Sequence, residues 1–172
     1  MLGMRTLVLL LAVAVWPAAA FSQAPEKEEL VPGKRMVRAV QFPFDQKVKF
    51  TLFPTGRLES VAGSAEVIRR KKGIEVDVEI EEAPPASQLK PEYRGYVVWA
   101  LTPAGQFVNL GAQTGKGTLK TTTRLPSFGI VVSAEADLKA TSPADPVLES
   151  GYPDAKRRFY PMRRVYYTPG VK

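Results

Sequence analysis

The sequence contains neither cysteine nor histidine. Without them the chain cannot supply a thiolate nucleophile, a Ser-His-Asp triad, a disulfide framework or the usual zinc and haem ligand sets. No other motif offers a replacement catalytic group. We therefore expect a protein that is not an enzyme, uses no cofactor and has no small-molecule substrate.

Long hydrophobic runs are absent after the first 24 residues. Before that point, Arg5 precedes nine apolar residues, Leu7 to Val15, and then small residues that include Ala20 and Ala24. This order is typical of a secretory signal peptide. Nine residues in a helix reach only about 14 Å, less than half of a hydrocarbon core of roughly 30 Å. We predict a signal peptide over residues 1–24, cleaved after Ala20 or Ala24, and a periplasmic or extracellular product with no transmembrane segment.

Helical spacing of apolar residues is also missing, and alternation takes its place. From Ile74 to Glu82 aliphatic and acidic residues alternate, which predicts a strand with one buried face. The loop 71–73 should join this strand to the preceding one as a hairpin, with Arg69 or Arg70 facing Glu75. Short runs of this kind recur about every ten residues and predict an all-β fold, an antiparallel immunoglobulin-like β-sandwich of seven to eight short strands. We assign residues 25–46 to a leader and possible first strand, 47–150 to the sandwich, and 151–172 to a basic aromatic tail or terminal strand.

One predicted strand is apolar on both faces. Its residues Tyr96, Val98 and Ala100 lie on one face and Val97, Trp99 and Leu101 on the other. Either this is a central strand covered on both sides, or its outer face is a docking patch for a protein partner. In the second case Tyr96, Trp99 and Phe107 are the candidate aromatic anchors.

Acidic residues are missing from the C-terminal end. The segment from Lys156 to Lys172 holds six of the 24 basic residues and no acid, whereas the rest of the chain after the signal peptide is balanced. A charge excess confined to one end argues against a nucleic-acid partner. The alternating aromatic and basic residues suit a terminal strand over 163–168 or an anion-binding segment. The candidate anion-binding residues are Lys156, Arg157, Arg158, Arg163, Arg164, Tyr166 and Tyr167.

The acidic residues do not predict a metal site. The row Glu75, Asp77, Glu79 and Glu81 has a spacing that could suit the paired acid and base of a glycosidase, but a solvated sheet face explains it fully. Glu135, Asp137 and Asp145 could offer oxygens to calcium, but their spacing fits no calcium loop. We expect no metal.

The second half of the chain carries a pattern of aromatic-aliphatic strand, glycine turn and late strand. It consists of the segments 96–106, 109–111, 127–135 and 142–147. Over about residues 62–149 this pattern resembles the C-terminal extracytoplasmic domain of anti-sigma-K factors and similar envelope modules. The resemblance implies a small exported sandwich that acts as a sensor, a binding module or a spacer. Because the chain has no transmembrane helix or cytoplasmic sigma-binding domain, the resemblance does not imply inhibition of a sigma factor.

Two functions follow from these observations. The first is an exported binding or structural module of the bacterial cell envelope that acts through protein or surface contacts. The second is an anion-binding module attached by its basic C-terminal segment to lipopolysaccharide, a cell-wall polymer or acidic lipid.

Overall fold

The computed structural model describes residues 33–56, 58, 60–154 and 160–170, and they form ten strands paired antiparallel. The all-β class predicted from the sequence is therefore confirmed. One short 3₁₀ turn, η1 (Ala86–Gln88), is the helical element of the described chain. Among these residues no helix has the length and apolar character needed to cross a membrane. The strands are β1 (Arg35–Gln41), β2 (Lys47–Pro54), β3 (Gly63–Arg70), β4 (Gly73–Ile80), β5 (Gly95–Leu101), β6 (Phe107–Gln113), β7 (Gly117–Thr123), β8 (Ser127–Glu135), β9 (Asp145–Pro153) and β10 (Met162–Tyr167).

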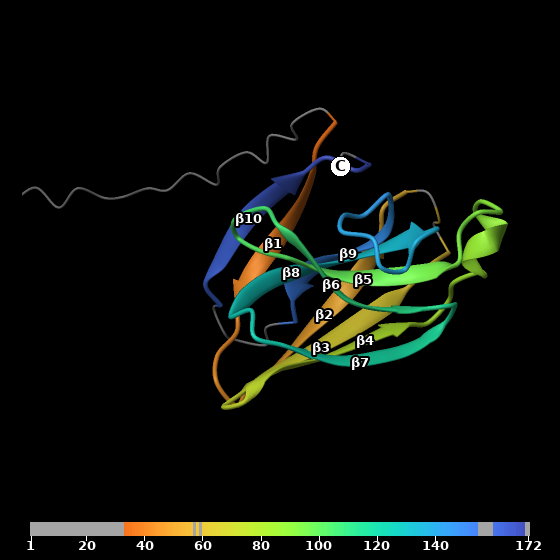
Figure 1. Cartoon of the computed structure of the whole chain (residues 1–172). Coiled ribbons are helices and arrows are strands. Elements are labelled where there is room, and N and C mark those ends of the chain that lie inside the picture. Colours follow the sequence, from red (N-terminus) through yellow and green to blue (C-terminus); the bar gives the residue numbers. More distant parts are fainter. Residues whose placement is uncertain (1–32, 57, 59, 155–159, 171–172) are drawn as a thin grey trace, which may run out of the picture.

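Eight of the strands form one strongly curved sheet. Hydrogen bonds link them in the order β6, β5, β8, β9, β2, β3, β4, β7. The two outer members meet again, since Gly111 of β6 lies against the Leu119 side chain of β7. The sheet is thus nearly closed into a barrel, as Figure 1 shows.

The first and last strands form a ribbon outside this curved sheet. β1 pairs with β10 over six residue pairs and with β8 only at Val40 and Gln41 (Figure 1). It crosses β8 at Gly129, where an added Cβ would lie 2.3 Å from Val37 Cγ1 and 2.9 Å from the Arg38 carbonyl oxygen. The missing side chain at Gly129 allows this close crossing.

Two hydrophobic cores result from this arrangement. The main core lies inside the curved sheet and contains Tyr96, Val98 and Ala100 of β5. The second lies between the sheet and the β1–β10 ribbon and contains the opposite face of β5, packed against Val37, Val131 and Val165. β5 is therefore a central strand covered on both sides, which excludes a docking patch on its outer face.

Both segments that flank 47–150 contribute a strand to the folded unit. β1 lies before residue 47 and β10 after residue 150, yet both belong to the same folded unit, which spans at least 35–167. The C-terminal segment contains a docked strand, the first of the two sequence alternatives. Ten strands are present where seven to eight were predicted. The predicted signal peptide lies outside the described residues.

Candidate functional site

The aromatic residues predicted as partner anchors belong to the cores. Tyr96 and Trp99 are both 0% exposed, so the prediction that they contact a partner is wrong. The Tyr96 hydroxyl donates to the Pro84 carbonyl at 2.6 Å, and burial raises its pKa. Trp99 donates from Nε1 to Ser133 Oγ at 2.7 Å. Phe107 is half-buried between Trp99 and Tyr167, with edge-on ring contacts to both.

The basic aromatic segment divides into structural and exposed residues. Tyr167 is 6% exposed, and its hydroxyl donates to Glu149, which also receives two hydrogen bonds from Arg35 at 2.5 and 2.8 Å. Burial beside this carboxylate raises the Tyr167 pKa. Because its hydroxyl is committed to Glu149, Tyr167 joins β10 to β9 and is not an anion-binding residue. Arg163, Arg164 and Tyr166 are exposed on β10, and Lys156, Arg157 and Arg158 lie outside the described residues.

A larger basic group lies where β3 turns into β4. The antiparallel register pairs Arg70 with Gly73, which leaves Lys71 and Lys72 as the exposed two-residue turn. β4 in turn pairs Ile74 with Thr123, so the chain leaving β7 brings Arg124 to the same end. Together these residues line an open groove of about 600 Å³. We call this set the cationic end: Arg69, Arg70, Lys71, Lys72 and Arg124.

An exposed aromatic ring completes the groove. Phe44 is 55% exposed, and the Arg69 guanidinium lies over its ring with 4.1 Å from Cζ to the ring centroid. The same guanidinium donates to the Phe42 carbonyl at 3.3 Å, and the Asp45 amide donates to the Arg69 carbonyl at 2.9 Å. The turn beside Phe44 is made by Asp45 at a φ of +51°, a conformation that Asp tolerates better than most residues. Phe44 and Arg69 are thus held at the groove wall by backbone contacts.

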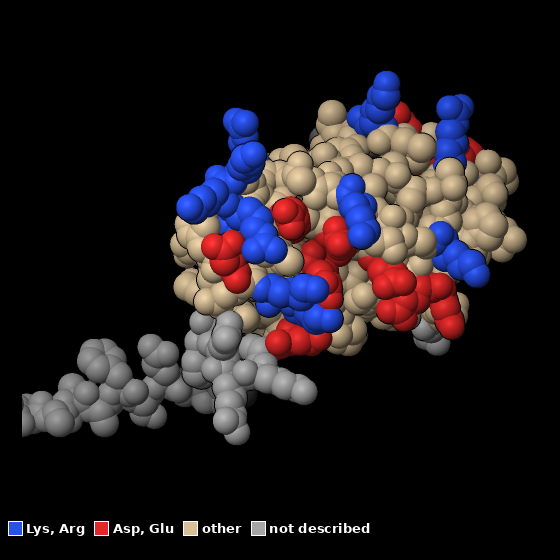
Figure 2. All heavy atoms as spheres, turned by 90° about the horizontal axis from the view of Figure 1, so that it is seen from below, with Lys and Arg blue, Asp and Glu red and all other residues tan. Residues whose placement is uncertain are grey.

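The cationic end keeps a net positive charge. Arg70 is paired with Asp45 at 3.1 Å and lies 3.8 Å from Glu75, as predicted for the hairpin. The other four basic residues form no ion pair with any residue the structure describes. In the view from below, Lys and Arg side chains project together at one end with acidic side chains among them, and across the middle both signs mix (Figure 2). A second groove of about 510 Å³ continues from Phe44 to Tyr160.

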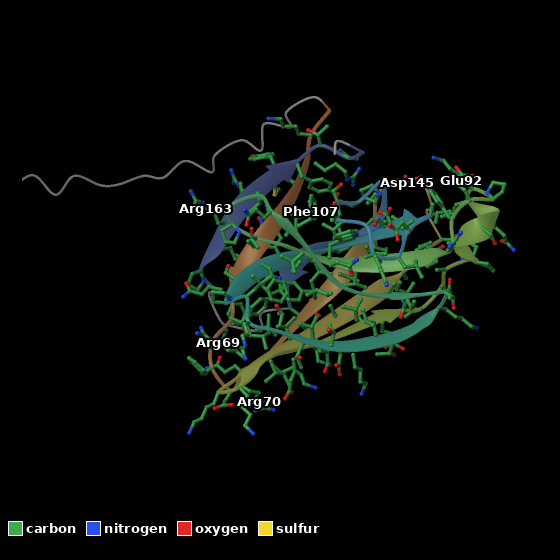
Figure 3. All side chains as sticks on the ribbon, in the orientation of Figure 1. Arg69, Arg70, Glu92, Phe107, Asp145 and Arg163 are labelled. Atoms are coloured by element: carbon green, nitrogen blue, oxygen red, sulfur yellow. The ribbon has the colours of Figure 1, made fainter. Side chains whose placement is uncertain are left out.

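A different kind of pocket lies at the opposite end of the molecule. Figure 3 shows Asp145 and Glu92 there, far from Arg69 and Arg70. The pocket measures about 340 Å³ and is formed by Tyr93, by Glu135 at the end of β8, by the loop 136–144 and by Gly170. We call it the Glu135 pocket. Burial raises the pKa of Glu135 above its ordinary value, although the Ser133 hydroxyl and Ala144 amide donate to its carboxylate.

The carboxylates near this pocket do not make a metal centre. Glu135 and Asp137 line it, and Asp145 lies beside it, where it accepts a hydrogen bond from the Tyr93 hydroxyl at 3.1 Å. Within the described chain no group of three or more acidic residues is placed to hold a metal ion. The calcium hypothesis for these three residues therefore finds no support in the geometry.

Comparison with protein-family models, with curated proteins and with solved structures finds no match. The resemblance to anti-sigma-K factors therefore stays a prediction.

The cationic end was missed as a site by sequence reasoning, although its signal is visible. Arg69 to Lys72 are four consecutive basic residues, which the pattern explains as a hairpin turn. Phe44 and Arg124 are far from them in sequence and reach the groove only through the β4–β7 pairing and the Phe44–Arg69 bridge.

Proposed function

We propose that this protein is a non-enzymatic, exported binding module that attaches to an anionic polymer or surface of the cell envelope through its cationic end. The observation that carries the proposal is the open groove lined by five Lys and Arg residues and the exposed Phe44 ring, with no acid among the described residues of its lining. Export is inferred from the predicted signal peptide. The proposal keeps the anion-binding function and moves it from the C-terminal segment to the β3–β4 turn.

The geometry suits a ligand with repeated negative charges. Each basic residue near an anionic surface contributes about 1 kcal/mol, so four unpaired ones contribute about 4 kcal/mol, equivalent to a Kd near 1 mM for one site. Such contacts are weak for a single small anion. They become effective on a polymer or surface, where a released group is immediately replaced by its neighbour. Phe44 adds apolar contact area beside the charges.

Charge reversal at the turn tests the proposal. Inorganic polyphosphate is titrated into the mature protein at low salt, and its affinity is compared among charge variants. The double variant K71E/K72E should bind at least about 30-fold more weakly, because two attractions of about 1 kcal/mol each are lost. K34E/K116E changes the net charge equally at two exposed residues away from the groove, and its affinity should stay near that of the wild type.

The same titration separates the two anion-binding locations. If R163E/R164E abolishes binding and K71E/K72E does not, the contact lies on β10 and the assignment to the cationic end is wrong. If all three variants weaken binding equally, only net charge matters and no site exists.

Protein contact is a second candidate, favoured by exposed apolar side chains near the β1–β10 ribbon. Phe53, Tyr152, Met162 and Tyr166 are each at least 40% exposed, and the Arg38 guanidinium lies 3.8 Å from the Tyr152 ring centroid. Apolar contacts resist salt, unlike the contacts of the cationic end. Binding of an envelope protein that persists at 0.5 M salt and is lost in Y152A would support this candidate.

A further inference from the structure

The Glu135 pocket holds a buried acid to which the described residues supply no counter-ion. Glu135 is 2% exposed and lines the pocket. It makes no ion pair with a residue that the structure describes, while Asp137 lies in the same lining and Asp145 beside it. Burying a carboxylate without a cation is unfavourable, so a cationic ligand in the pocket would stabilise the charged form of Glu135.

The hydrogen bonds of Glu135 leave one oxygen available. The Ser133 hydroxyl, at 2.5 Å, and the Ala144 amide, at 2.7 Å, both donate to Oε1. None of the described residues donates a hydrogen bond to Oε2. Every fully buried side-chain oxygen of these residues has a hydrogen-bond partner, so Oε2 is not fully buried. It is therefore accessible from the pocket that Glu135 lines.

The surroundings select the kind of ligand. Among the described residues that line the pocket, the charged ones are Glu135, Asp137 and Lys139, so acids outnumber bases in the lining. Outside the lining, Lys90 lies 4.0 Å from Asp145, and the backbone amide of Arg94 donates to the Glu135 carbonyl at 2.8 Å. The described acids are not arranged to hold a metal ion. A volume of about 340 Å³ is sufficient for a small organic molecule, and the Tyr93 ring gives the wall an aromatic surface.

We propose that the Glu135 pocket binds a small organic cation of the primary-ammonium class, with the ammonium group donating a hydrogen bond to Glu135 Oε2. The alkyl part of the ligand would lie along Tyr93 and Pro143. This site is independent of the cationic end, which lies at the opposite end of the molecule (Figure 3).

Trp99 provides a direct reporter for the site. Its indole Nε1 donates to Ser133 Oγ, which donates to Glu135, so a change at the carboxylate reaches the indole through two hydrogen bonds. A chain that begins at Phe21 lacks Trp16 and has Trp99 as its single tryptophan. Its ¹H–¹⁵N spectrum then shows one indole signal, which can be followed during titration with n-pentylamine. The uncharged 1-pentanol serves as the control ligand.

The expected result is a saturable shift of the indole signal with pentylamine and none with pentanol. Glu135→Gln keeps the shape and the acceptor for Ser133 and Ala144 but removes the charge, and should weaken pentylamine binding by at least about tenfold. Glu92→Gln removes an exposed acid at the same end of the molecule and should change the affinity less than about twofold. Asp137→Asn is a second variant in the lining, should E135Q not fold, and should weaken binding about threefold.

Three results would overturn the proposal. The first is no indole shift up to 50 mM pentylamine, a concentration chosen as about 50 times a Kd of 1 mM. The second is equal binding of pentanol and pentylamine, which means that the pocket recognises only the alkyl chain. The third is unchanged pentylamine affinity in both E135Q and D137N.

Discussion

Glu135 makes the stability of the protein depend on pH. Its pKa is raised by burial and by the nearby charges of Asp145 and Asp137, so the folded protein keeps the proton to a higher pH than the unfolded chain. Between the unfolded and folded pKa values the folded state binds more protons. The free energy of unfolding therefore falls as pH rises through this window.

The first prediction concerns Glu135→Gln. Gln does not titrate, so the free energy of unfolding of the variant, relative to wild type, should increase as pH rises from 4 to 7. Urea unfolding at a series of pH values measures this difference. E92Q, which removes an exposed acid at the same end of the molecule, is measured in parallel as the charge-matched control. A difference between E135Q and wild type that does not change with pH would show that Glu135 titrates alike in both states.

The second prediction concerns the crossing of β1 over β8. A methyl group at Gly129 would overlap Val37 Cγ1 and approach the Arg38 carbonyl, so Gly129→Ala should destabilise the protein by about 1–3 kcal/mol. Gly115→Ala is the matched control, because nothing lies within 4 Å of its added Cβ, and its effect should stay within about 0.5 kcal/mol. Thermal or urea unfolding compares the two. Equal changes in unfolding free energy for the two variants would mean that β1 and β8 accommodate the added methyl group without strain.

At the scale of secondary-structure elements, hydrogen bonds to one carboxylate join β1, β9 and β10. Arg35 of β1 and Tyr167 of β10 both donate to Glu149 of β9, and Arg35 also donates to the Thr55 carbonyl at 3.1 Å. The carboxylate is largely buried, with 14% of its side chain exposed, so these hydrogen bonds are poorly screened by solvent. This network holds the ribbon over the second core.

The third prediction tests this network. Tyr167→Phe removes a hydrogen bond to a charged group and should cost about 1.5–3 kcal/mol of unfolding free energy. Tyr166→Phe changes the adjacent, exposed tyrosine and should be neutral within about 0.5 kcal/mol. Urea unfolding midpoints of the two variants provide the comparison. A neutral Y167F would show that packing alone holds β10.

Local elements could be predicted from the sequence more completely than their partners. Alternation in 74–82 and the flanking turns place β4 correctly, and the two apolar faces of 95–101 correctly indicate a strand that is either covered or a docking surface. The cover itself is formed by β1 and β10, more than 50 residues away on either side, and periodicity carries no information about such pairing. In 162–167 Val165 and Tyr167 face inward while Arg164 and Tyr166 face outward, a period of two that fits the docked strand.

For the molecule as a whole, two sites of opposite charge lie at opposite ends of the same curved sheet. The cationic end collects basic residues from the β3–β4 turn and from the chain after β7, whereas the Glu135 pocket collects acids from β8 and its loop. The sequence shows part of each grouping, the basic run 69–72 and the acids 135–145. The groove and the pocket themselves could not be predicted, because Phe44 and Arg124 in one, and Tyr93 and Gly170 in the other, come from distant segments. The charge excess of the C-terminal segment predicted anion binding on β10 instead.

Substitution is a better test of this arrangement than truncation. Removing the chain from residue 155 onward would delete β10 and uncover Trp99, Leu101 and Val131 of the second core. The exposed apolar surface would then adhere to many partners. Charge reversal at exposed turn residues leaves both cores intact.

The most direct measurement is co-sedimentation of wild-type protein, K71E/K72E and K34E/K116E with isolated cell-envelope fractions at 0.05 and 0.5 M salt, where the screening lengths differ roughly threefold. We predict that wild type and K34E/K116E pellet at low salt and stay in solution at high salt, and that K71E/K72E stays in solution at both. Pelleting of K71E/K72E to the same extent as wild type at low salt would contradict attachment through the cationic end.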